Sequence, residues 1–289
     1  MIGGSFALAA KRAGIAQRIT GWDFNERAGL ALDRGVIDDI ERGFESRRVI
    51  DADLVYLAAP VGAIIDFLRE RGGSLKPGAI VTDAGSTKRE ICRAARKSLP
   101  RHVHFVGGHP MSGSHKTGVE FASADLFRGS PYALVRADGA SESGGEQAGA
   151  LSVIFELVES LKARPVLLTA EQHDSTVARI SHAPQLLSTA LAIAGSHSGV
   201  EDVNAVAGGG FHEMTRLAKS KWSVWEDICR TNGDEITSAL DELIAEIGAL
   251  RGSISRGDFR TAREAFRTAN DFIQQLNAGI QTPLIKDKE

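Results

Sequence analysis

Side chains that can exchange a proton occur where predicted strands end. His109 lies in the segment GGHPMSGSHKTG, and Ser86 and Lys88 lie in VTDAGSTK. An imidazole that follows two glycines and precedes a proline is expected in a loop, outside any helix, where a bound ligand can reach it. Of the eight histidines, His109 is therefore the one that we predict to act as an acid–base group.

Two other kinds of chemistry have less support from these residues. A nucleophilic Ser86 would need the turn G-x-S-x-G, which the sequence DAGST lacks. His102 and His104 alternate on one predicted strand, but no cysteine or carboxylate completes a metal-ligand spacing around them. We therefore expect core or surface histidines there and no metal site.

Arg216 is a candidate for binding a carboxylate. It follows the glycine-rich segment GGGFHEMT, and a guanidinium at such a place can form a paired hydrogen bond with a carboxylate. The alternative for an isolated arginine is a surface salt bridge. Gly208–Gly210 resemble a phosphate-binding loop, but no Lys-Ser or Lys-Thr pair follows them.

The first residues, MIGGSFALAAKRAG, are typical of the last part of a dinucleotide-binding turn. Gly3 and Gly4 precede an alanine-rich helix whose N-terminus would face a pyrophosphate. Asp23 ends the predicted strand RITGWD about 20 residues further on, where a carboxylate holds ribose hydroxyls and repels a 2′-phosphate. This predicts NAD as the cofactor. The alternatives are that Asp23 only caps the turn DFNER and that Arg27 accepts a phosphate.

The elements that must position these residues alternate between strand and helix up to about Leu168. Six short apolar runs, RITGWD, ADLVYLAAP, GAIVTDAGS, HVHFVGGHP, PYALVRA and RPVLLT, predict a parallel sheet covered by helices, an α/β fold of the Rossmann-like type. Parallel strands end at one edge, so Ala58–Pro60, Ser86 and His109 are expected to converge there. The alternative for Ala58–Pro60 is a tight turn that binds no ligand.

Strand patterns disappear after Leu168. Thr169 can cap a new helix with Gln172 reaching back, which divides the chain into domains 1–168 and 169–289. The second domain is predicted to be all-helical and contains an apolar stripe at three- and four-residue steps: Ile236, Leu240, Leu243, Ile244, Ile247 and Leu250. The stripe fits either a helical core within the chain or a dimer interface.

Composition limits the class of protein. The chain has 289 residues, a net charge of −3 and 43% hydrophobic residues, so we expect two globular domains and a small-molecule or protein partner, with no nucleic acid. The two cysteines lack metal-ligand spacing and indicate a reducing cytoplasm. The apolar stretch after Ile2 is too short for a signal peptide, and no run reaches the length of a membrane span.

Taken together, these segments resemble the prephenate/arogenate (cyclohexadienyl) dehydrogenase family, the oxidoreductases of tyrosine biosynthesis. The segments IGGS, DAGSTK, GGHPMSGSHKTG, SHAPQ and GGGFHEMTRLAKS…WEDI occur in family order over nearly the whole chain, and GGHPMSGS followed by TRLAKS is the most specific pair. The resemblance implies oxidative decarboxylation of prephenate or arogenate with NAD, and a homodimer formed through a helical dimerisation domain.

The resemblance also implies roles for single residues. His109 takes the proton of the ring hydroxyl as hydride leaves the same carbon, and Ser86 helps to orient it. Arg216 binds the side-chain carboxylate of the substrate. The remaining implied substrate contacts are His182, Ser112, Gly113 and Ser114, and the implied cofactor contacts are Ile2, Gly3, Gly4, Asp23, Ala58, Ala59, Pro60 and Ser86.

Some residues depart from the family pattern. Family members often carry an acid in place of His115 and a histidine in place of Gln185, so the choice between prephenate and arogenate, and any tyrosine feedback, stay open. The family turn reads roughly G-L-G-L-I-G-G-S, and we therefore expect a start upstream of Met1, with roughly ten more residues for one strand and its turn. Two other functions stay open: a two-domain NAD-dependent hydroxy-acid dehydrogenase, and a non-catalytic protein that binds ligand and dimerises.

Overall fold

The computed structural model describes residues 1–43, 45–113, 117–136 and 145–281. The predicted substrate contact Ser114, like His115, lies outside the described residues. Contacts divide the chain into two compact units, Met1–Ile236 and Thr237–Glu289. The domain boundary that we place at residue 168 stays a prediction, as does the expected upstream start.

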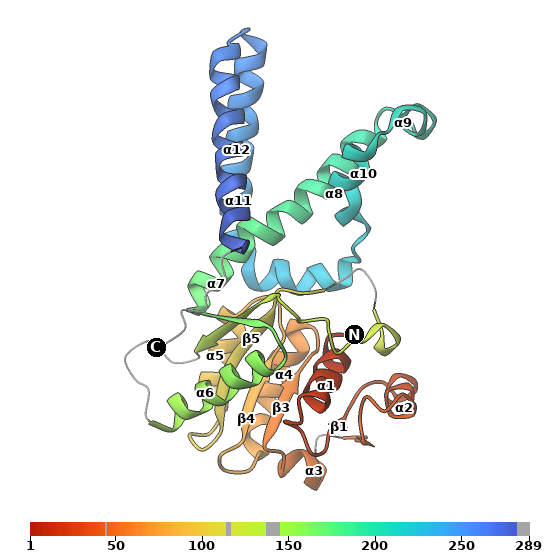
Figure 1. Ribbon diagram of the computed structural model, residues 1–289, viewed down its shortest axis with the longest axis vertical. Coiled ribbons are helices and arrows are strands. Elements are labelled where there is room, and N and C mark those ends of the chain that lie inside the picture. Colours follow the sequence, from red (N-terminus) through yellow and green to blue (C-terminus); the bar gives the residue numbers. More distant parts are fainter. Residues whose placement is uncertain (44, 114–116, 137–144, 282–289) are drawn as a thin grey trace. The chain divides into compact units, whose positions relative to one another are not determined.

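A five-stranded sheet in the order β3-β4-β5-β6-β7 forms the centre of the first unit, and a separate two-stranded sheet pairs β1 with β2 (Figure 1). The strands are β1 (Thr20–Gly21), β2 (Asp39–Ile40), β3 (Leu54–Leu57), β4 (Ile80–Asp83), β5 (His104–Pro110), β6 (Pro131–Arg136) and β7 (Arg164–Leu168). Each of the six predicted runs contains a strand. Only β2, which is two residues long, has no counterpart in the sequence-based prediction.

The predicted parallel pairing is confirmed for β3, β4 and β5. The structure departs from it at β6, which runs antiparallel to β5 and parallel to β7. A parallel connection needs a long crossover, usually a helix. Between β5 and β6 the described residues contain only the 3-10 turn η2 (Val119–Phe121), so the chain returns in the opposite direction.

Helices cover both faces of the sheet. On one face, α4 (Val61–Glu70) and α5 (Arg89–Ser98) pack against Val81, Phe105 and Val135. On the other face, α1 (Ile2–Arg12) and α6 (Gly145–Ser160) pack against side chains that include Val106 and Leu134. This sandwich is a Rossmann-like α/β domain, as the alternating pattern predicts.

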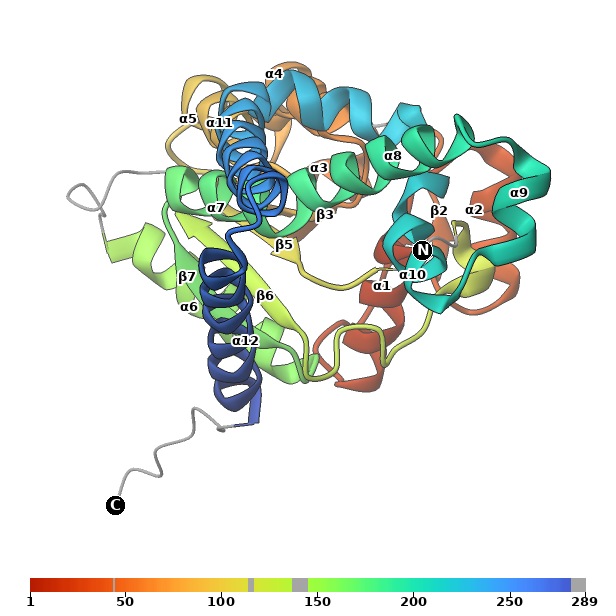
Figure 2. The same ribbon diagram turned by 90° about the horizontal axis from the view of Figure 1, so that it is seen from above.

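After β7 the described part of the chain contains helices and helical turns but no strand. It forms α7 (Ala170–Val177), a π-helical turn η3 (Ala178–His182), α8 (Ala183–Ser196), α9 (Val200–Val206), α10 (Gly209–Thr215), a 3-10 turn η4 (Arg216–Lys219), α11 (Trp222–Ser255) and α12 (Phe259–Gln281). The predicted cap of α7 is confirmed, since Thr169 Oγ1 accepts from Gln172 N at 3.1 Å and Gln172 Oε1 accepts from Thr169 N at 2.9 Å. Figure 2 looks down on α7 and α8, and α7 contacts both β6 and α5.

Helix α11 is interrupted at Asn232, whose backbone is not helical (φ −138°, ψ 23°). The part before this interruption belongs to the first unit together with α7–α10. The remaining short helices of the first unit are α2 (Asn25–Asp33), α3 (Arg47–Ile50) and η1 (Gly72–Ser74).

The second unit consists of the end of α11 and of α12, joined by a turn at Gly257 (φ +67°). The apolar stripe reaches into this unit, where Ile244 is 64% exposed and Ile247 is 47% exposed. Helix α12 adds further exposed apolar side chains: Phe259, Phe266, Phe272, Ile273 and Leu276. Of the two alternatives for the stripe, this exposure favours an interface with another chain over a core within this one.

Candidate active site

Three predicted site segments meet at one edge of the sheet, because β3, β4 and β5 are neighbouring parallel strands. Ala58–Pro60 follow β3, Ser86 lies in the turn after β4, and His109 lies at the end of β5. The predicted convergence is therefore confirmed. The loop expected around His109 is wrong: β6 pairs with β5 as far as His109 and Pro110, which keeps the imidazole on a strand.

The glycine before His109 is required by the packing of β5 on β4. A Cβ atom at Gly108 would lie 2.4 Å from the carbonyl oxygen of Asp83 and 3.1 Å from Thr82 Oγ1. Gly108 N also donates to Asp83 Oδ1 at 3.0 Å. Any side chain at Gly108 would push the strand that carries His109 away from β4.

Asp83 and Lys88 form a completely buried ion pair below the turn that carries Ser86. Asp83 Oδ2 accepts from Lys88 Nζ and, at 2.8 Å, from Gly85 N. One carboxylate thus holds both the Ser86 turn and, through Gly108, the His109 strand. Breaking such a pair leaves an uncompensated buried charge, which typically costs about 3–5 kcal/mol.

His109 is the outer member of a chain of three hydrogen-bonded side chains. His109 Nδ1 lies 2.9 Å from His173 Nε2, and His173 Nδ1 lies 2.7 Å from Asp174 Oδ1. An ionised carboxylate only accepts, so the proton of His173 is on Nδ1 and its Nε2 accepts from His109 Nδ1–H. The network therefore leaves Nε2 of His109 without a proton.

Burial keeps the histidines of the site neutral. Desolvation lowers the pKa of His109 well below the ordinary histidine value, and electrostatic interactions with His173, Lys88 and His182 lower it further. Burial also lowers the pKa of His173, and it lowers the pKa of His182 to about 4. A neutral imidazole is the form that accepts a proton.

Asp174 stays charged at the centre of this network. Burial disfavours its ionisation, but hydrogen bonds from His173 and from the backbone of Lys88 and Arg89 outweigh that effect and lower its pKa. Lys88 N donates to Oδ1 at 2.7 Å and Arg89 N donates to Oδ2 at 2.9 Å. The carboxylate of α7 thus binds the first backbone N–H groups of α5.

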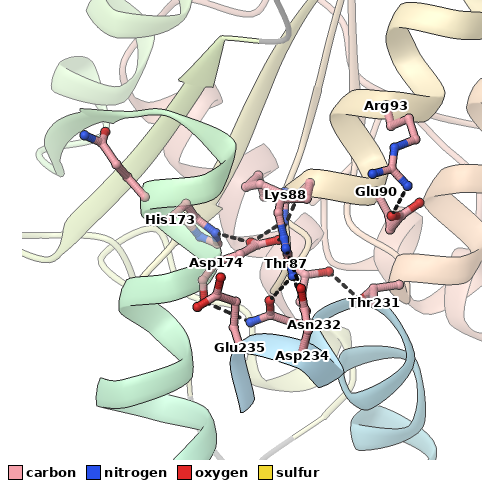
Figure 3. A network of polar contacts seen from close by, with 12 residues as sticks. Thr87, Lys88, Glu90, Arg93, His173, Asp174, Thr231, Asn232, Asp234 and Glu235 are labelled. Carbon is pink, nitrogen blue, oxygen red and sulfur yellow. Dashed lines mark hydrogen bonds and ion pairs between the residues drawn. The ribbon is translucent and has the colours of Figure 1, made fainter. Parts of the chain in front are cut away.

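Residues of α11 also form hydrogen bonds with Asp174 of α7 and Arg89 of α5 (Figure 3). The fully buried Asn232 donates from Nδ2 to the carbonyl oxygen of Asp174 at 2.9 Å and accepts from Arg89 Nη2 at 3.0 Å. Arg89 also pairs with Asp234, which lowers the pKa of that carboxyl to about 2. Helices α5, α7 and α11 are therefore fixed around the histidines by polar contacts.

The other predicted substrate contacts differ in accessibility. Ser86 is half-buried, and its hydroxyl forms no hydrogen bond with any described residue. Ser112 Oγ is buried without a partner in the described part of the chain, and Gly113 is exposed. His182 is only 2% exposed; its Nδ1 lies 3.4 Å from Asn232 Nδ2, and its ring meets that of Trp225 edge-on at 5.7 Å.

Arg216 is the first residue of η4 and is exposed. It forms no salt bridge with the residues that the structure describes, so the surface ion pair considered as its alternative is not found there. No contact among the described residues brings Arg216 together with the His109 network. It stays a predicted carboxylate-binding residue.

The start of α1 fits a dinucleotide. A Cβ atom at Gly3 would lie 3.0 Å from Cβ of Ala58, closer than such atoms normally approach, so glycine favours this close packing on the turn after β3. No side chain caps the N-terminus of α1, and Ala58, Ala59 and Pro60 are exposed beside it. A helix N-terminus lined by small residues can receive a pyrophosphate.

Gly4 and Asp23 complete the nucleotide end. A Cβ atom at Gly4 would lie 3.0 Å from Cβ of Ala122, which makes this glycine a packing residue. Asp23 is exposed after β1. Asp23 Oδ1 also accepts from Phe24 N at 2.7 Å. This contact belongs to the turn DFNER, which is the alternative role considered for Asp23.

Four residues with a part in this arrangement were not assigned one from the sequence: His173, Asp174, Asn232 and Asp83. The dipeptide His173-Asp174 in AEQHD was the available signal, but it reads equally well as the polar face of a capped helix. Among the described residues, no three His, Cys, Asp or Glu side chains are grouped as a metal site. The same residues include no helix that is long and apolar enough to cross a membrane.

Sequence families match both parts of the chain. Residues 6–167 match the family described as "Prephenate dehydrogenase, nucleotide-binding domain", and residues 169–268 match "Prephenate dehydrogenase, dimerization domain". A prephenate dehydrogenase of Bacillus subtilis (strain 168) is 36% identical over 278 residues, which are 94% of this chain and 72% of that protein. A cyclohexadienyl dehydrogenase of Zymomonas mobilis is 30% identical over 92% of this chain and 90% of its own length.

Solved structures show the same fold. Prephenate dehydrogenase from A. aeolicus in complex with hydroxyphenyl propionate and NAD+ superposes with a TM-score of 0.86 at 26% identity, covering 95% of this chain and 94% of that one. Synechocystis arogenate dehydrogenase superposes with a TM-score of 0.79 at 25% identity, covering 95% of this chain and 96% of that one.

Proposed function

We propose an activity for this chain, starting from the family to which it belongs. It is a member of the prephenate dehydrogenase family, and the two domains of that family match residues 6–167 and 169–268. It is an NAD-dependent oxidoreductase, and the reaction is the oxidative decarboxylation of prephenate or arogenate to 4-hydroxyphenylpyruvate or tyrosine. The observation that carries the proposal is the row of hydrogen-bonded side chains from Asp174 through His173 to His109. It leaves an unprotonated imidazole nitrogen of His109 that can accept a proton.

His109 acts as the general base. Its unprotonated Nε2 accepts the proton of the ring hydroxyl, and the O–H electron pair forms the C=O bond as hydride leaves the same carbon. NAD, when bound, supplies the acceptor for that hydride. The imidazolium that results is stabilised by His173, whose own proton remains directed at Asp174.

The ketone formed in this step is conjugated through the ring to the carbon that bears the ring carboxylate. The C–C bond to that carboxylate can then break and release CO₂, and its electron pair moves through the ring to the ketone oxygen, which takes up a proton. The ring becomes aromatic, which makes the loss of CO₂ favourable. This step needs orientation of the substrate more than it needs an additional acid or base.

The substrate side chain ends in a carboxylate, which we assign to Arg216. A guanidinium can hold a carboxylate with two parallel hydrogen bonds, and Arg216 offers its own without a competing acid among the described residues. Ser86 and Ser112 have hydroxyl groups without partners in the described structure, and these fit hydrogen bonds to the substrate hydroxyl or to the cofactor.

We further propose that two copies of the chain associate through the exposed apolar side chains of Thr237–Gln281. Ile244, Phe266 and Phe272 are each at least 60% exposed there, and burying such side chains stabilises an association by about 25 cal/mol per Å² of apolar surface. Both cysteines are free thiols, consistent with the cytoplasmic location proposed from their number and spacing.

The test is a comparison of substrates with the purified protein. NADH formation is followed at 340 nm with prephenate, arogenate and a simple hydroxy acid such as malate, each with NAD and with NADP. Saturable turnover of prephenate or arogenate, with release of one CO₂ per NADH, is the expected result. Turnover of the hydroxy acid alone, or no turnover of any substrate while ligand still binds, would support one of the alternative functions instead.

A further inference from the structure

We infer that Gln185 and Ser188 of α8 are positioning residues for Arg216, and that Gln185 does not itself bind the substrate. This inference rests on the proposed function, because it assumes that Arg216 binds the substrate carboxylate. It concerns two side chains that are buried in the first unit and belong neither to the histidine relay nor to the nucleotide end.

Three hydrogen bonds from α8 hold the turn that begins at Arg216. Gln185 Nε2 donates to the carbonyl oxygen of Leu217 at 2.7 Å, and Gln185 Oε1 accepts from Ser220 Oγ at 3.1 Å. Ser188 Oγ accepts from Ala218 N at 3.2 Å. The residues directly after Arg216 are thus fixed to two neighbouring positions on one face of α8.

Both ends of the Gln185 amide are used in these contacts. The carboxamide has one acceptor oxygen and one NH₂ group, and each already has a partner: Leu217 of η4 for the NH₂ group and Ser220, directly after η4, for the oxygen. The side chain is 6% exposed, and Ser188 is 2% exposed. Because both ends of the amide hold the turn and the side chain is almost fully buried, we expect the effect of Gln185 on substrate binding to pass through Arg216.

The η4 turn needs these contacts with α8 because its own hydrogen bonds give it little stability. Turn η4 has four residues, Arg216–Lys219, and its 3-10 geometry gives weaker hydrogen bonds than an α-helix. Helix α10 before it is also seated on α8, where a Cβ atom at Gly195 would lie 2.8 Å from Cζ of Phe211. Helix α8 therefore carries α10 and η4, and the Arg216 backbone is held although its guanidinium is free to meet a ligand.

The test compares three variants of the full chain. Gln185→Met removes both hydrogen bonds at similar volume, and Ser188→Ala removes the acceptor for Ala218 N. Ser196→Ala is the matched control on the same helix, because the Ser196 hydroxyl bonds only its own helix at the carbonyl oxygen of Ile193. We expect KM for prephenate or arogenate to rise about five- to thirty-fold in Gln185→Met and less in Ser188→Ala. In both variants kcat and KM for NAD stay within about twofold of the unmodified protein, and Ser196→Ala changes none of these values.

A double-variant cycle separates positioning from direct binding. In the Arg216→Ala background, Gln185→Met should raise KM no further, because the side chain that it positions is gone. Independent, multiplicative effects on KM would mean that Gln185 contacts the substrate itself and would overturn the inference. Wild-type KM in both Gln185→Met and Ser188→Ala would overturn it as well.

Hydrogen exchange of the Ala218 amide tests the anchoring without any turnover. We expect faster exchange in Ser188→Ala and Gln185→Met than in the unmodified protein and in Ser196→Ala. Unchanged exchange would overturn the anchoring, whereas absence of prephenate and arogenate turnover in the unmodified protein would overturn the proposed function and leave this result standing. If Gln185→Met does not fold, Ser188→Ala supplies both readouts.

Discussion

His109 and Arg216 lie in opposite environments, although the proposed reaction needs both. Nδ1 of His109 is hydrogen-bonded to His173, and behind it every charged group, from Asp174 to Lys88, has its partners inside the chain. Arg216 is exposed and unpaired among the described residues, and only its backbone turn is anchored. The hydrogen bonds around His109 are therefore formed before a ligand binds, whereas the charge of Arg216 has no partner among the described residues until a ligand supplies one.

This difference follows from what each end does. A general base works only in one tautomer and one protonation state, so its surroundings have to fix both before reaction. An arginine that binds a carboxylate contributes binding free energy only when the ligand is present. An ion pair between this arginine and an acid of the protein would have to be broken before the ligand could bind. We therefore expect substitutions at the two ends to change different kinetic constants.

The largest effect is expected for His109→Ala. Without the base, the hydroxyl proton has no acceptor as hydride leaves, and kcat should fall by about 10² to 10⁴. KM for the substrate should change little, since the carboxylate clamp is intact. Steady-state kinetics with NAD in excess measure both, and near-normal turnover in this variant would place the base elsewhere.

Arg216→Ala should act on binding. Loss of a charge-assisted pair with the substrate carboxylate should raise KM by an amount equivalent to about 2–5 kcal/mol if the pair is desolvated in the complex. KM for NAD should be unchanged. Arg216→Lys is the control: it keeps the charge but loses the planar fork, so its KM should lie between the other two. An unchanged substrate KM in Arg216→Ala would remove this residue from the site.

The relay behind His109 gives a smaller effect. In Asp174→Asn the amide no longer enforces the Nδ1–H form of His173, and kcat should fall roughly 10- to 100-fold, less than on loss of the base itself. The control is Asp234→Asn, an exposed acid that binds Arg89 but neither histidine. Equal kcat values in the two variants, with both folded by circular dichroism, would show that the relay has no part in turnover.

The smallest effect concerns the cofactor. Replacing Asp23 by Ser removes a charge next to the position of a 2′-phosphate, and an exposed charge at such a distance is worth about 1 kcal/mol, or about fivefold. The ratio of kcat/KM for NAD to that for NADP should narrow by that factor. A ratio that stays the same would mean that Asp23 serves only its contact with Phe24 N.

The sequence allows the sheet edge of the site to be predicted more fully than the network behind it. Strand runs and the order of parallel strands place Ser86 and His109 at one edge, and the Thr169–Gln172 cap is local enough to be recognised from four residues. Local pattern and short loops determine these features. The exception is β6, whose direction depends on the connection after Pro110 and not on its own residues.

The partners of His109 could not be predicted, because they come from distant segments. His173 and Asp174 are more than 60 positions away in sequence, and Asn232 reaches Asp174 across 58 positions. Nothing in their local pattern distinguishes them from an ordinary polar helix face. The same holds for Gln185. The resemblance to the family marks this residue as a departure, but its partners Leu217 and Ser220 become apparent only in the folded chain.

The dependence of kcat/KM on pH tests most directly whether the network prepares His109 as a neutral base. Burial lowers the pKa of His109, so the unprotonated form is present above that value and is lost as the pH falls through it. We predict that kcat/KM is constant around neutral pH and decreases only on the acidic side of about 6.5, the ordinary histidine value, and that His109→Ala lacks this decrease. A profile that falls already above pH 7, or the same acidic limb in His109→Ala, would contradict the assignment of the base and of the relay that holds it.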